Sequence, residues 1–300
     1  MDKLRGIQTF IEIADRGSLT AAAHALDTSL PTVVRRLAEL EAALGVRLFN
    51  RTTRRIHLTD EGQRYLAICK NALGQLEEAE DTLFDTRAEP AGKLVVTAPV
   101  LFGRLHVAPL LREFMRLHPR LTVEMLLLDR NIDLIEEGVD VAVRIGTPAE
   151  SSLHAVPAGL LRRVICGSPA YLKRHGTPRH PSELRSHAGI RFTGRGVLSE
   201  WQFCENGRIF GMPVPAHLTT NSVEAAVDAC RDGLGLGAFL SYQVQLPVQA
   251  GELKPVLRKY ETEPVPVTLL YPHSKLMSTR VRAFIDFAVP RLRACDFMKL

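Results

Sequence analysis

The sequence predicts an α/β protein in two parts, in which a long linker helix joins a small helical head to a larger body of two lobes. Three observations carry this prediction. Residues 17–58 hold two short capped helices and an arginine-rich hairpin. A single long helical pattern comes next. Beyond residue 90, strand and helix patterns alternate through two successive sets, which is typical of doubly wound α/β lobes.

The head begins with a helix that ends at Gly17, a residue suited to a left-handed C-terminal cap. Ser18 is the expected cap of a second helix, because its hydroxyl can accept from the free amides of the first turn. The first helix has apolar residues at the spacing of one apolar stripe, namely Leu4, Ile7, Ile11 and Ala14.

A third helix has Ser29 as its expected cap and Pro31 in its first turn, where a missing N–H costs little. The stripe that we expect to be buried consists of Val33, Leu37, Leu40 and Leu44. At about 100° per residue, Arg35 lies almost opposite this stripe. The sequence therefore predicts that Arg35 faces outward.

Two alternating runs after Gly45 predict a hairpin, or wing, that turns at Thr52 and Thr53. The apolar positions of the two runs are Val46, Leu48, Ile56 and Leu58. Residues 28–58 carry six arginines against two acidic residues. A helix pair followed by a basic wing is the layout of a DNA-binding head.

These residues also carry a family resemblance. The stretch TSLPTVVRRLAELEAALGVRLFNRTTRRIHLTDEG resembles the winged helix-turn-helix of LysR-type transcriptional regulators, and the length and later architecture of the chain resemble that family too. The resemblance implies DNA-binding roles for Ser18, Thr20, Ser29, Leu30, Pro31, Thr32, Val34, Arg35, Arg36, Arg51 and Arg54.

Two of these residues depart from the common pattern of the family. Leu30 stands where the family usually has a polar residue, often glutamine, and Val34 stands where it usually has serine. Neither side chain can hydrogen-bond a base, which favours apolar contacts at both positions. Arg35 is then the residue expected to pair with guanine through two hydrogen bonds.

Thr59 is the expected cap of the linker helix, and Asp60 and Glu61 suit its positive end. The apolar seam of this helix consists of Leu66, Cys69, Leu73, Leu76 and Leu83. This helix either packs on its own domain or pairs with a second linker helix. We favour the pairing, because the apolar seam and the family resemblance both support it. The predicted assembly is a homodimer or tetramer, and two symmetric heads prefer a dyad-symmetric DNA site.

The body begins after a hinge at residues 89–92. We expect strands at 93–99, 121–128, 139–144, 163–167, 189–192, 201–204, 208–212, 217–220, 236–240 and 265–271, and helices at 105–117, 132–137, 169–175, 222–232 and 278–292. Two lobes joined by two crossovers resemble the periplasmic-binding-protein-like (type II) effector domain of the same family. The expected domains are 1–59, 60–90 and 91–300, with lobe I at about 91–162 and 266–300 and lobe II at about 163–265.

A ligand is expected in the cleft, near the carboxyl ends of strands and the starts of helices. Free amides at a helix start favour anions, and Arg144 adds a positive charge, so the predicted effector is a small carboxylate or a phenol. A salt bridge with Asp140 or another acid is the alternative role of Arg144. The expected effector-binding residues are Thr97, Ala98, Pro99, Val100, Phe102, Arg144, Ile145, Phe192, Thr193, Asn221 and Ser222.

Composition limits the other classes of function. The net charge is +5, the apolar runs are too short to span a membrane, and the charged amino terminus predicts a cytoplasmic protein. Five scattered cysteines without metal-ligand spacing are expected to be structural thiols, with no close pair among them. We expect no metal and no cofactor. RNA polymerase is a further candidate partner, on the strength of the resemblance alone.

Two other functions remain as alternatives. A solute carrier would use the same two lobes, but the winged head and the charged amino terminus count against it. An enzyme with a fused DNA-binding head is the other. Gly233, Gly235 and Gly237 follow a helix and precede a strand, which is the reverse of the order in a dinucleotide-binding fingerprint. The sequence also has no GxSxG, HExxH or P-loop motif, which counts against an enzyme.

Overall fold

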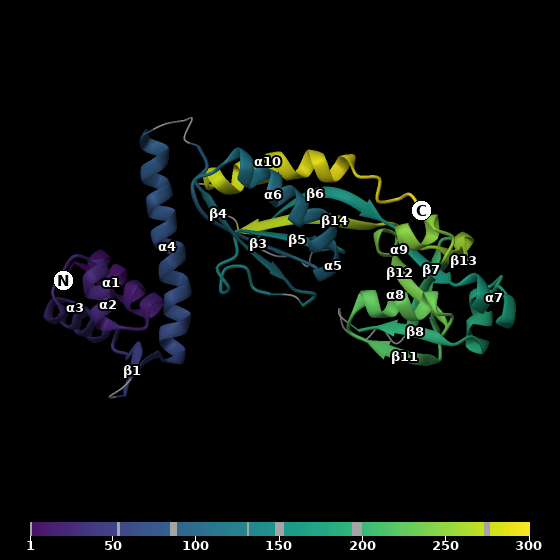
Figure 1. The fold of residues 1–300 in the computed structure, drawn as a ribbon, viewed down its shortest axis with the longest axis horizontal. Helices are drawn as coiled ribbons and strands as arrows, with labels where there is room; N and C mark the ends of the chain where they lie inside the picture. The colour runs from purple at the N-terminus through teal and green to yellow at the C-terminus, as the bar shows by residue number, and fades with distance from the viewer. Residues whose placement is uncertain are drawn as a thin grey trace. The chain divides into compact units, whose positions relative to one another are not determined.

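The computed structural model describes residues 2–52, 55–84, 89–130, 132–147, 153–193, 200–272 and 277–300 (Figure 1). The chain divides into two compact units. One unit comprises residues 1–88 with 133–139, and the other comprises residues 89–132 with 140–300. We call residues 2–58 of the first unit the head, and we call the second unit the body.

The head contains the three predicted helices, α1 (Lys3–Arg16), α2 (Leu19–Ala25) and α3 (Leu30–Leu44). Gly17 and Gly45 end α1 and α3 in the left-handed conformation, with φ of 62° and 71°. The buried residues that hold the head together are Phe10, Ile13, Ala22, Ala23, Val33, Leu37, Leu40, Leu48 and Phe49. The predicted buried stripe of α3 is confirmed at its first three positions, and Leu44 packs at the margin.

The fully buried face of α1 is shifted by part of a turn from the predicted stripe, whose residues Ile7, Ile11 and Ala14 pack half-buried against the head core. The face that is buried centres on Gly6, Phe10 and Ile13, whereas Leu4 is 41% exposed. The Phe10 ring explains the shift, because it lies 5.4 Å from the ring of Phe49 in the wing and draws its own side of the helix inward. A large aromatic side chain buries more apolar area than the aliphatic residues beside it.

The wing consists of β1 (Phe49–Thr52) and β2 (Arg55–Leu58), which run antiparallel with Phe49 opposite Leu58 and Thr52 opposite Arg55. The predicted hairpin is confirmed, while residues 53–54 of its turn lie outside the described residues. Glu41 connects α3 to the start of the wing, because its carboxylate accepts from the Leu48 amide at 2.8 Å.

The linker helix is α4 (Asp60–Phe84), and Thr59 caps it as predicted. The Thr59 hydroxyl accepts from the Gly62 amide at 2.9 Å and donates to the Arg47 carbonyl at 2.8 Å. Cys69 is buried against the head, whereas Ile68 and Leu76 are exposed. A Cβ atom at Gly62 would overlap the Leu48 carbonyl oxygen, so the start of α4 lies directly against the wing.

The body begins with lobe I, a five-stranded mixed sheet (Figure 1). Its strands, in spatial order, are β4 (Leu121–Leu127), β3 (Gly92–Ala98), β5 (Val141–Ile145), β14 (Val265–Pro272) and β6 (Leu153–Leu161). Strand β3 pairs in parallel with β4 and β5, and β14 runs antiparallel to β5 and β6. Helices α6 (Ala108–Leu117) and α10 (Thr279–Ala294) meet through Phe114 and Phe284, whose rings lie 5.4 Å apart.

Lobe II is a second five-stranded mixed sheet with an attached hairpin. Its strands, in spatial order, are β11 (Ala216–Thr220), β8 (Gly189–Phe192), β12 (Leu236–Leu240), β7 (Arg163–Gly167) and β13 (Lys254–Val256). Its helices are α7 (Pro169–His175), α8 (Val223–Arg231) and α9 (Ser241–Gln249), with 3₁₀ turns at Pro181–Ser186 and Arg258–Tyr260.

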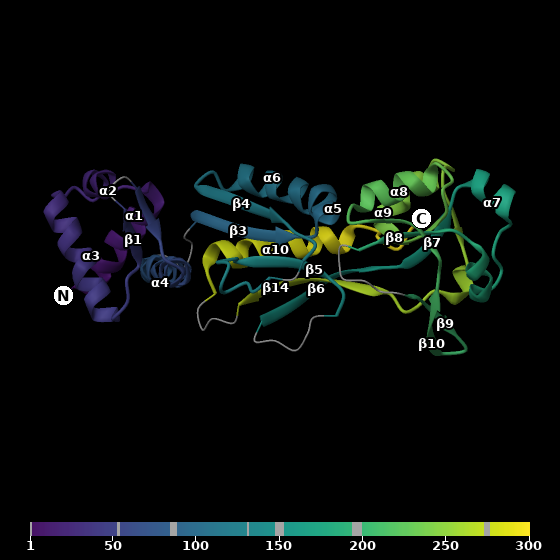
Figure 2. The same ribbon diagram turned by 90° about the horizontal axis from the view of Figure 1, so that it is seen from below.

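The predicted hairpin is β9 (Glu200–Glu205) with β10 (Arg208–Pro213), and it extends from lobe II (Figure 2). Asn206 and Gly207 turn it with φ of 51° and 77°, as a two-residue hairpin loop requires. The chain passes between the lobes at Arg162 and again at residues 261–264.

Three expectations for residues 91–300 were wrong. Residues 132–137 form turns, because the Asp133 carboxylate accepts from the amides of Ile135 and Glu136 at 2.8 and 3.1 Å. The helix expected from residue 105 begins earlier, as α5 (Val100–Phe102) and a π-helical turn (Gly103–Val107). Strands β6 and β13 and helix α9 were not predicted.

Among the helices in the described part of the chain, none combines the length and the apolar content that crossing a membrane requires.

Candidate nucleic-acid interface and ligand cavity

Helices α2 and α3 form the helix pair predicted from the sequence. Ser18 caps α2 by accepting from the Ala21 amide at 3.4 Å, and Asp27 in the intervening turn has a positive φ of 47°. Ser29 stands at the N-cap of α3, but its hydroxyl bonds the Thr32 hydroxyl at 2.8 Å and makes no cap hydrogen bond to the backbone. Ser29 therefore occupies the predicted cap position, but its side chain does not make the hydrogen bond of a cap.

The outer face of α3 presents the residues that were expected to contact DNA. Leu30, Pro31 and Arg35 are exposed, and Val34 is half-buried. Arg35 faces outward as predicted, with its side chain 73% exposed and its Nε 3.8 Å from Oε1 of Glu39. An exposed pair of this kind contributes about 0–1 kcal/mol, so it does not hold Arg35 away from a ligand.

A depression of about 180 Å³ lies beside this face, where α1 begins. It is lined by Asp2, Arg5, Gly6, Arg35, Arg36 and Glu39. Three guanidinium groups therefore gather between the start of α1 and the middle of α3, accompanied by two carboxylates.

The remaining predicted DNA-binding residues lie around these helices. Ser18 and Thr32 are half-buried and Thr20 is exposed. Arg51 lies in β1 opposite Ile56, which places its backbone in the wing, and its side chain is outside the described part of the structure. Arg54 lies outside the described residues altogether.

The body contains a cavity of about 370 Å³ between its two lobes. Lobe II supplies most of the lining, through β7, β8, β12 and the β9 strand of the hairpin. The apolar and aromatic lining residues include Leu101, Val164, Ile190, Trp201, Phe203, Val223, Phe239, Tyr242, Leu257 and Tyr260. A pocket with such walls and a few polar groups suits a small organic ligand.

The polar groups on the cavity wall are of both signs. They include Arg163, Arg191, Asp129, Glu200, Gln202, Gln243 and Glu261. Glu261 is already held by Arg162, whose Nη2 and Nε donate to its two carboxylate oxygens at 2.7 and 2.8 Å. The hydrogen bond to Glu261 raises the pKa of Arg162 above its usual range. The charge of Glu261 is thus balanced at the point where the chain crosses between the lobes.

The predicted effector-binding residues divide into two groups. Pro99, Ile145 and Phe192 line the cavity. The others, all of them described, stand outside its lining: Thr97, Ala98, Val100, Phe102, Arg144, Thr193, Asn221 and Ser222.

Four of the residues outside the lining, Thr97, Arg144, Thr193 and Ser222, form hydrogen bonds elsewhere. Arg144 donates to the Val143 carbonyl at 3.1 Å and to the Thr97 hydroxyl at 3.4 Å. Asp140, the acid considered for Arg144, accepts from the Val95 amide at 2.8 Å and from Arg280 at 3.3 Å. Thr193 donates to the Thr220 carbonyl, and Ser222 caps α8 by accepting from the Ala225 amide.

Sequence reasoning did not identify the residues that form most of the cavity wall. Tyr242 and Gln243 belong to α9, a helix with Pro247 in its interior and no apolar period. Trp201 belongs to the hairpin, which was predicted as a hairpin without any assignment of its faces. The single tryptophan of the chain was the available signal, because so large a side chain is seldom placed without a packing or binding role.

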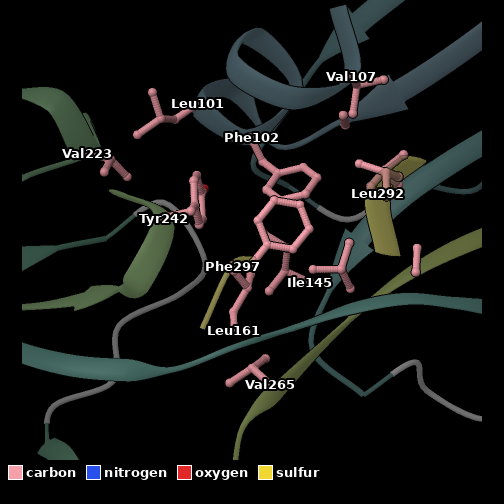
Figure 3. Packing of buried hydrophobic residues seen from close by; sticks show 14 of the residues in the cluster. Leu101, Phe102, Val107, Ile145, Leu161, Val223, Tyr242, Val265, Leu292 and Phe297 are labelled. Carbon is pink, nitrogen blue, oxygen red and sulfur yellow. The ribbon is translucent and has the colours of Figure 1, made fainter. Parts of the chain in front are cut away.

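Aromatic side chains join the lobes beside the cavity (Figure 3). Phe102 of lobe I lies 5.1 Å from Tyr242 of lobe II and 5.5 Å from Phe297 of the C-terminal segment, between ring centroids. His106 completes the group at 4.9 Å from Phe297, and burial lowers the pKa of its imidazole. An ion pair between Arg104 and Glu224, at 3.6 Å, also links the lobes.

The cysteines include one pair that the sequence spacing concealed. The Cys230 thiol donates to the Cys166 carbonyl at 3.2 Å, and both residues are fully buried. Burial raises the pKa of both thiols, that of Cys230 to about 12. A protonated, inaccessible thiol is a poor nucleophile, which agrees with a structural role. Within the described residues, no group of three or more histidine, cysteine or acidic side chains is placed to hold a metal ion.

Comparisons with known proteins agree with this geometry. Residues 4–63 match the family described as bacterial regulatory helix-turn-helix protein, lysR family, and residues 87–293 match the LysR substrate binding domain. The chain is 35% identical to an HTH-type transcriptional regulator of Xanthomonas campestris pv. campestris, over 96% of this chain and 86% of that protein.

Solved structures give the same assignment. CrgA, a LysR-type transcriptional regulator from Neisseria meningitidis, is 30% identical with a TM-score of 0.62, over 96% of this chain and 98% of that one. The full-length Vibrio cholerae virulence activator AphB is 26% identical with a TM-score of 0.61, over the same shares of the two chains. The chain belongs to the LysR family of DNA-binding transcriptional regulators, with a helix-turn-helix head and an effector-binding body.

Proposed function

We propose that the protein binds a dyad-symmetric DNA site as a homodimer or tetramer, with α3 in the major groove and the wing against the flanking backbone. The observation that carries this proposal is the two-sided character of α3. One side is buried through Val33, Leu37 and Leu40, and the opposite side presents Arg35 to solvent. Helices of this kind enter the major groove with their N-terminal residues toward the bases.

The proposed contacts follow from position on the head. Ser29, Leu30, Pro31, Val34 and Arg35 approach base edges and neighbouring phosphates. The residues that contact the phosphate backbone are Ser18, Thr20, Thr32, Arg36, Arg51 and Arg54. Phosphate contacts of this type give affinity without sequence preference, and base contacts give specificity.

The proposed effector is a small carboxylate or phenol with an apolar or aromatic body, bound in the cavity between the lobes. Pro99, Ile145 and Phe192 are the predicted residues that support this site. Arg163 and Arg191 take over the charged role first assigned to Arg144, because they stand on the cavity wall. The aromatic rings of Trp201 and Tyr242 then enclose the body of the ligand.

The protein acts in the cytoplasm on this account, without enzymatic activity. Pairing of two α4 helices forms the dimer, since Leu76 of the predicted apolar seam is exposed and Ile68 of the same helix is exposed too. Contact with RNA polymerase on a neighbouring promoter is proposed from family membership alone.

Two experiments test the effector site. A thermal-shift screen of the full-length protein against benzoates, aliphatic carboxylates and phenols is expected to find at least one ligand that raises the melting temperature. Arg191→Ala is expected to abolish the shift for the carboxylates, while Arg112→Ala, an exposed arginine on α6, retains it. If no anionic or phenolic compound binds, or if Arg191→Ala and Arg163→Ala both bind as the wild type does, the proposed effector class is wrong.

A further inference from the structure

The first turn of α3 presents an apolar patch at the place where a DNA-reading helix makes its specific contacts. Leu30 is 41% exposed, Pro31 beside it is exposed, and Val34 is half-buried one turn further along. Leu30 and Val34 are four residues apart, so their side chains are neighbours on one face of the helix. Arg35 follows at the edge of this patch.

The hydroxyl groups next to the patch are engaged with each other. Ser29 and Thr32 form a hydrogen bond of 2.8 Å between their side-chain oxygens. The first turn therefore offers a methyl-rich surface bordered by a hydroxyl pair that uses one of its two O–H donors internally, and the charged donor at its edge is the Arg35 guanidinium, which is 73% exposed.

The surroundings of the patch identify its occupant as DNA. Arg5, Arg35 and Arg36 line the adjacent depression. A phosphate backbone held by such arginines brings base edges, and no hydrophobic protein surface, against the patch. In the major groove, the apolar feature that a base edge presents is the C5-methyl group of thymine.

We propose that Leu30 and Val34 select thymine by contact with its methyl group, next to a guanine that Arg35 reads. This inference rests on the proposed DNA binding and adds the base preference of each half-site. A methyl group removed from water contributes about a fourfold gain in affinity. A dyad-symmetric site carries each contact twice.

The test uses deoxyuridine, which differs from thymidine by this one methyl group. Full-length protein first selects its binding site from random duplexes, and each thymine of the selected half-site is then replaced by deoxyuridine. We expect about a fourfold loss of affinity for each contacted methyl, measured by fluorescence anisotropy. Leu30→Ala is expected to bind the thymidine and deoxyuridine forms equally at the position that Leu30 contacts.

Leu4→Ala is the matched control, because Leu4 is exposed to the same extent, 41%, on α1 of the same head. It is expected to retain the full wild-type penalty for deoxyuridine. The proposal is overturned if deoxyuridine at every thymine of the site leaves wild-type affinity unchanged, or if Leu30→Ala retains the penalty. Both results leave DNA binding itself intact. Failure to select any duplex would instead overturn the proposed function, and the base preference with it.

Discussion

At the scale of single residues, Arg35 is expected to determine guanine recognition. Its exposed guanidinium can pair with the two acceptors of a guanine edge, which is worth about 1–3 kcal/mol of discrimination. Arg35→Ala should lose the preference for guanine at one position of each half-site in a base-by-base binding scan. Arg16→Ala is the control, since Arg16 pairs with Glu12 at the same i, i+4 spacing on α1. An unchanged guanine preference in Arg35→Ala would refute the assignment.

Residue-level prediction from the sequence succeeded where helical periodicity decides the outcome. The outward direction of Arg35 follows from the buried positions Val33, Leu37 and Leu40 on the other side of the same helix. The structure places Arg144 outside the cavity lining, where it hydrogen-bonds within its own sheet. Whether a strand residue faces a cavity depends on how two lobes pack, and that information is not local to the strand.

At the scale of elements, the start of α4 packs closely against the chain that leads into the wing. A Cβ atom at Gly62 would overlap the Leu48 carbonyl oxygen, whereas one at Gly74 of the same helix would meet nothing within 4 Å. Alanine favours a helix over glycine by about 1 kcal/mol. Gly74→Ala should therefore raise the free energy of unfolding by up to about 1 kcal/mol. Gly62→Ala should lower it by about 1–3 kcal/mol, because backbone must move.

Urea unfolding of both variants, followed by circular dichroism, measures these changes. The two glycine-to-alanine substitutions in α4 are expected to change the free energy of unfolding in opposite directions. Equal stabilisation by both alanines would show that α4 does not lie against the wing as described.

Helices and strands could be predicted from the sequence where the capping residues, the turn residues and the spacing of apolar residues all indicate the same element. Ser168 and Gly176 bound α7, and Asn206 with Gly207 fixed the turn of the hairpin. Strand β6 escaped prediction because Pro157 interrupts it, and proline is tolerated there since β6 lies at the edge of its sheet. Helix α9 has an internal proline, and tertiary packing holds it despite that.

At the scale of the whole molecule, the C-terminal segment fastens the two lobes together. Phe297 is 4% exposed among rings from both lobes (Figure 3), and its carbonyl accepts from the buried Ser241 hydroxyl at 2.5 Å. Phe297→Ala should destabilise the body by about 3–5 kcal/mol, because it leaves a cavity between the lobes. Met298→Ala, at 36% exposure, is the control and should have little effect. Calorimetry of the full chain measures both, and equal melting of the two variants would contradict this role.

The same aromatic group makes stability depend on pH. Burial holds the pKa of His106 below its ordinary value of about 6.5. As the pH falls below about 6.5, the unfolded chain takes up a proton that the folded ring refuses, so protonation favours unfolding. The contribution of His106 is complete above that pH and is lost as the pH falls toward its folded pKa.

The free energy of unfolding should therefore fall between about pH 7.5 and about pH 5.5, and fall less in His106→Leu. His187, whose pKa burial also lowers, contributes with the same sign in both proteins. Urea unfolding at the two pH values gives the comparison. An identical decrease in the variant would show that His106 is not held neutral by burial.

In the proposed function, α3 of the head lies in the groove of a duplex while arginines contact the flanking phosphates. The most direct measurement is equilibrium binding of the full-length protein to the DNA upstream of its own gene, over a range of salt concentrations and against unrelated duplex as competitor. We expect site-specific binding whose log K falls with log salt at about −0.9 per phosphate contact. Binding that shows no preference for this DNA over the competitor, or no dependence on salt, would contradict it.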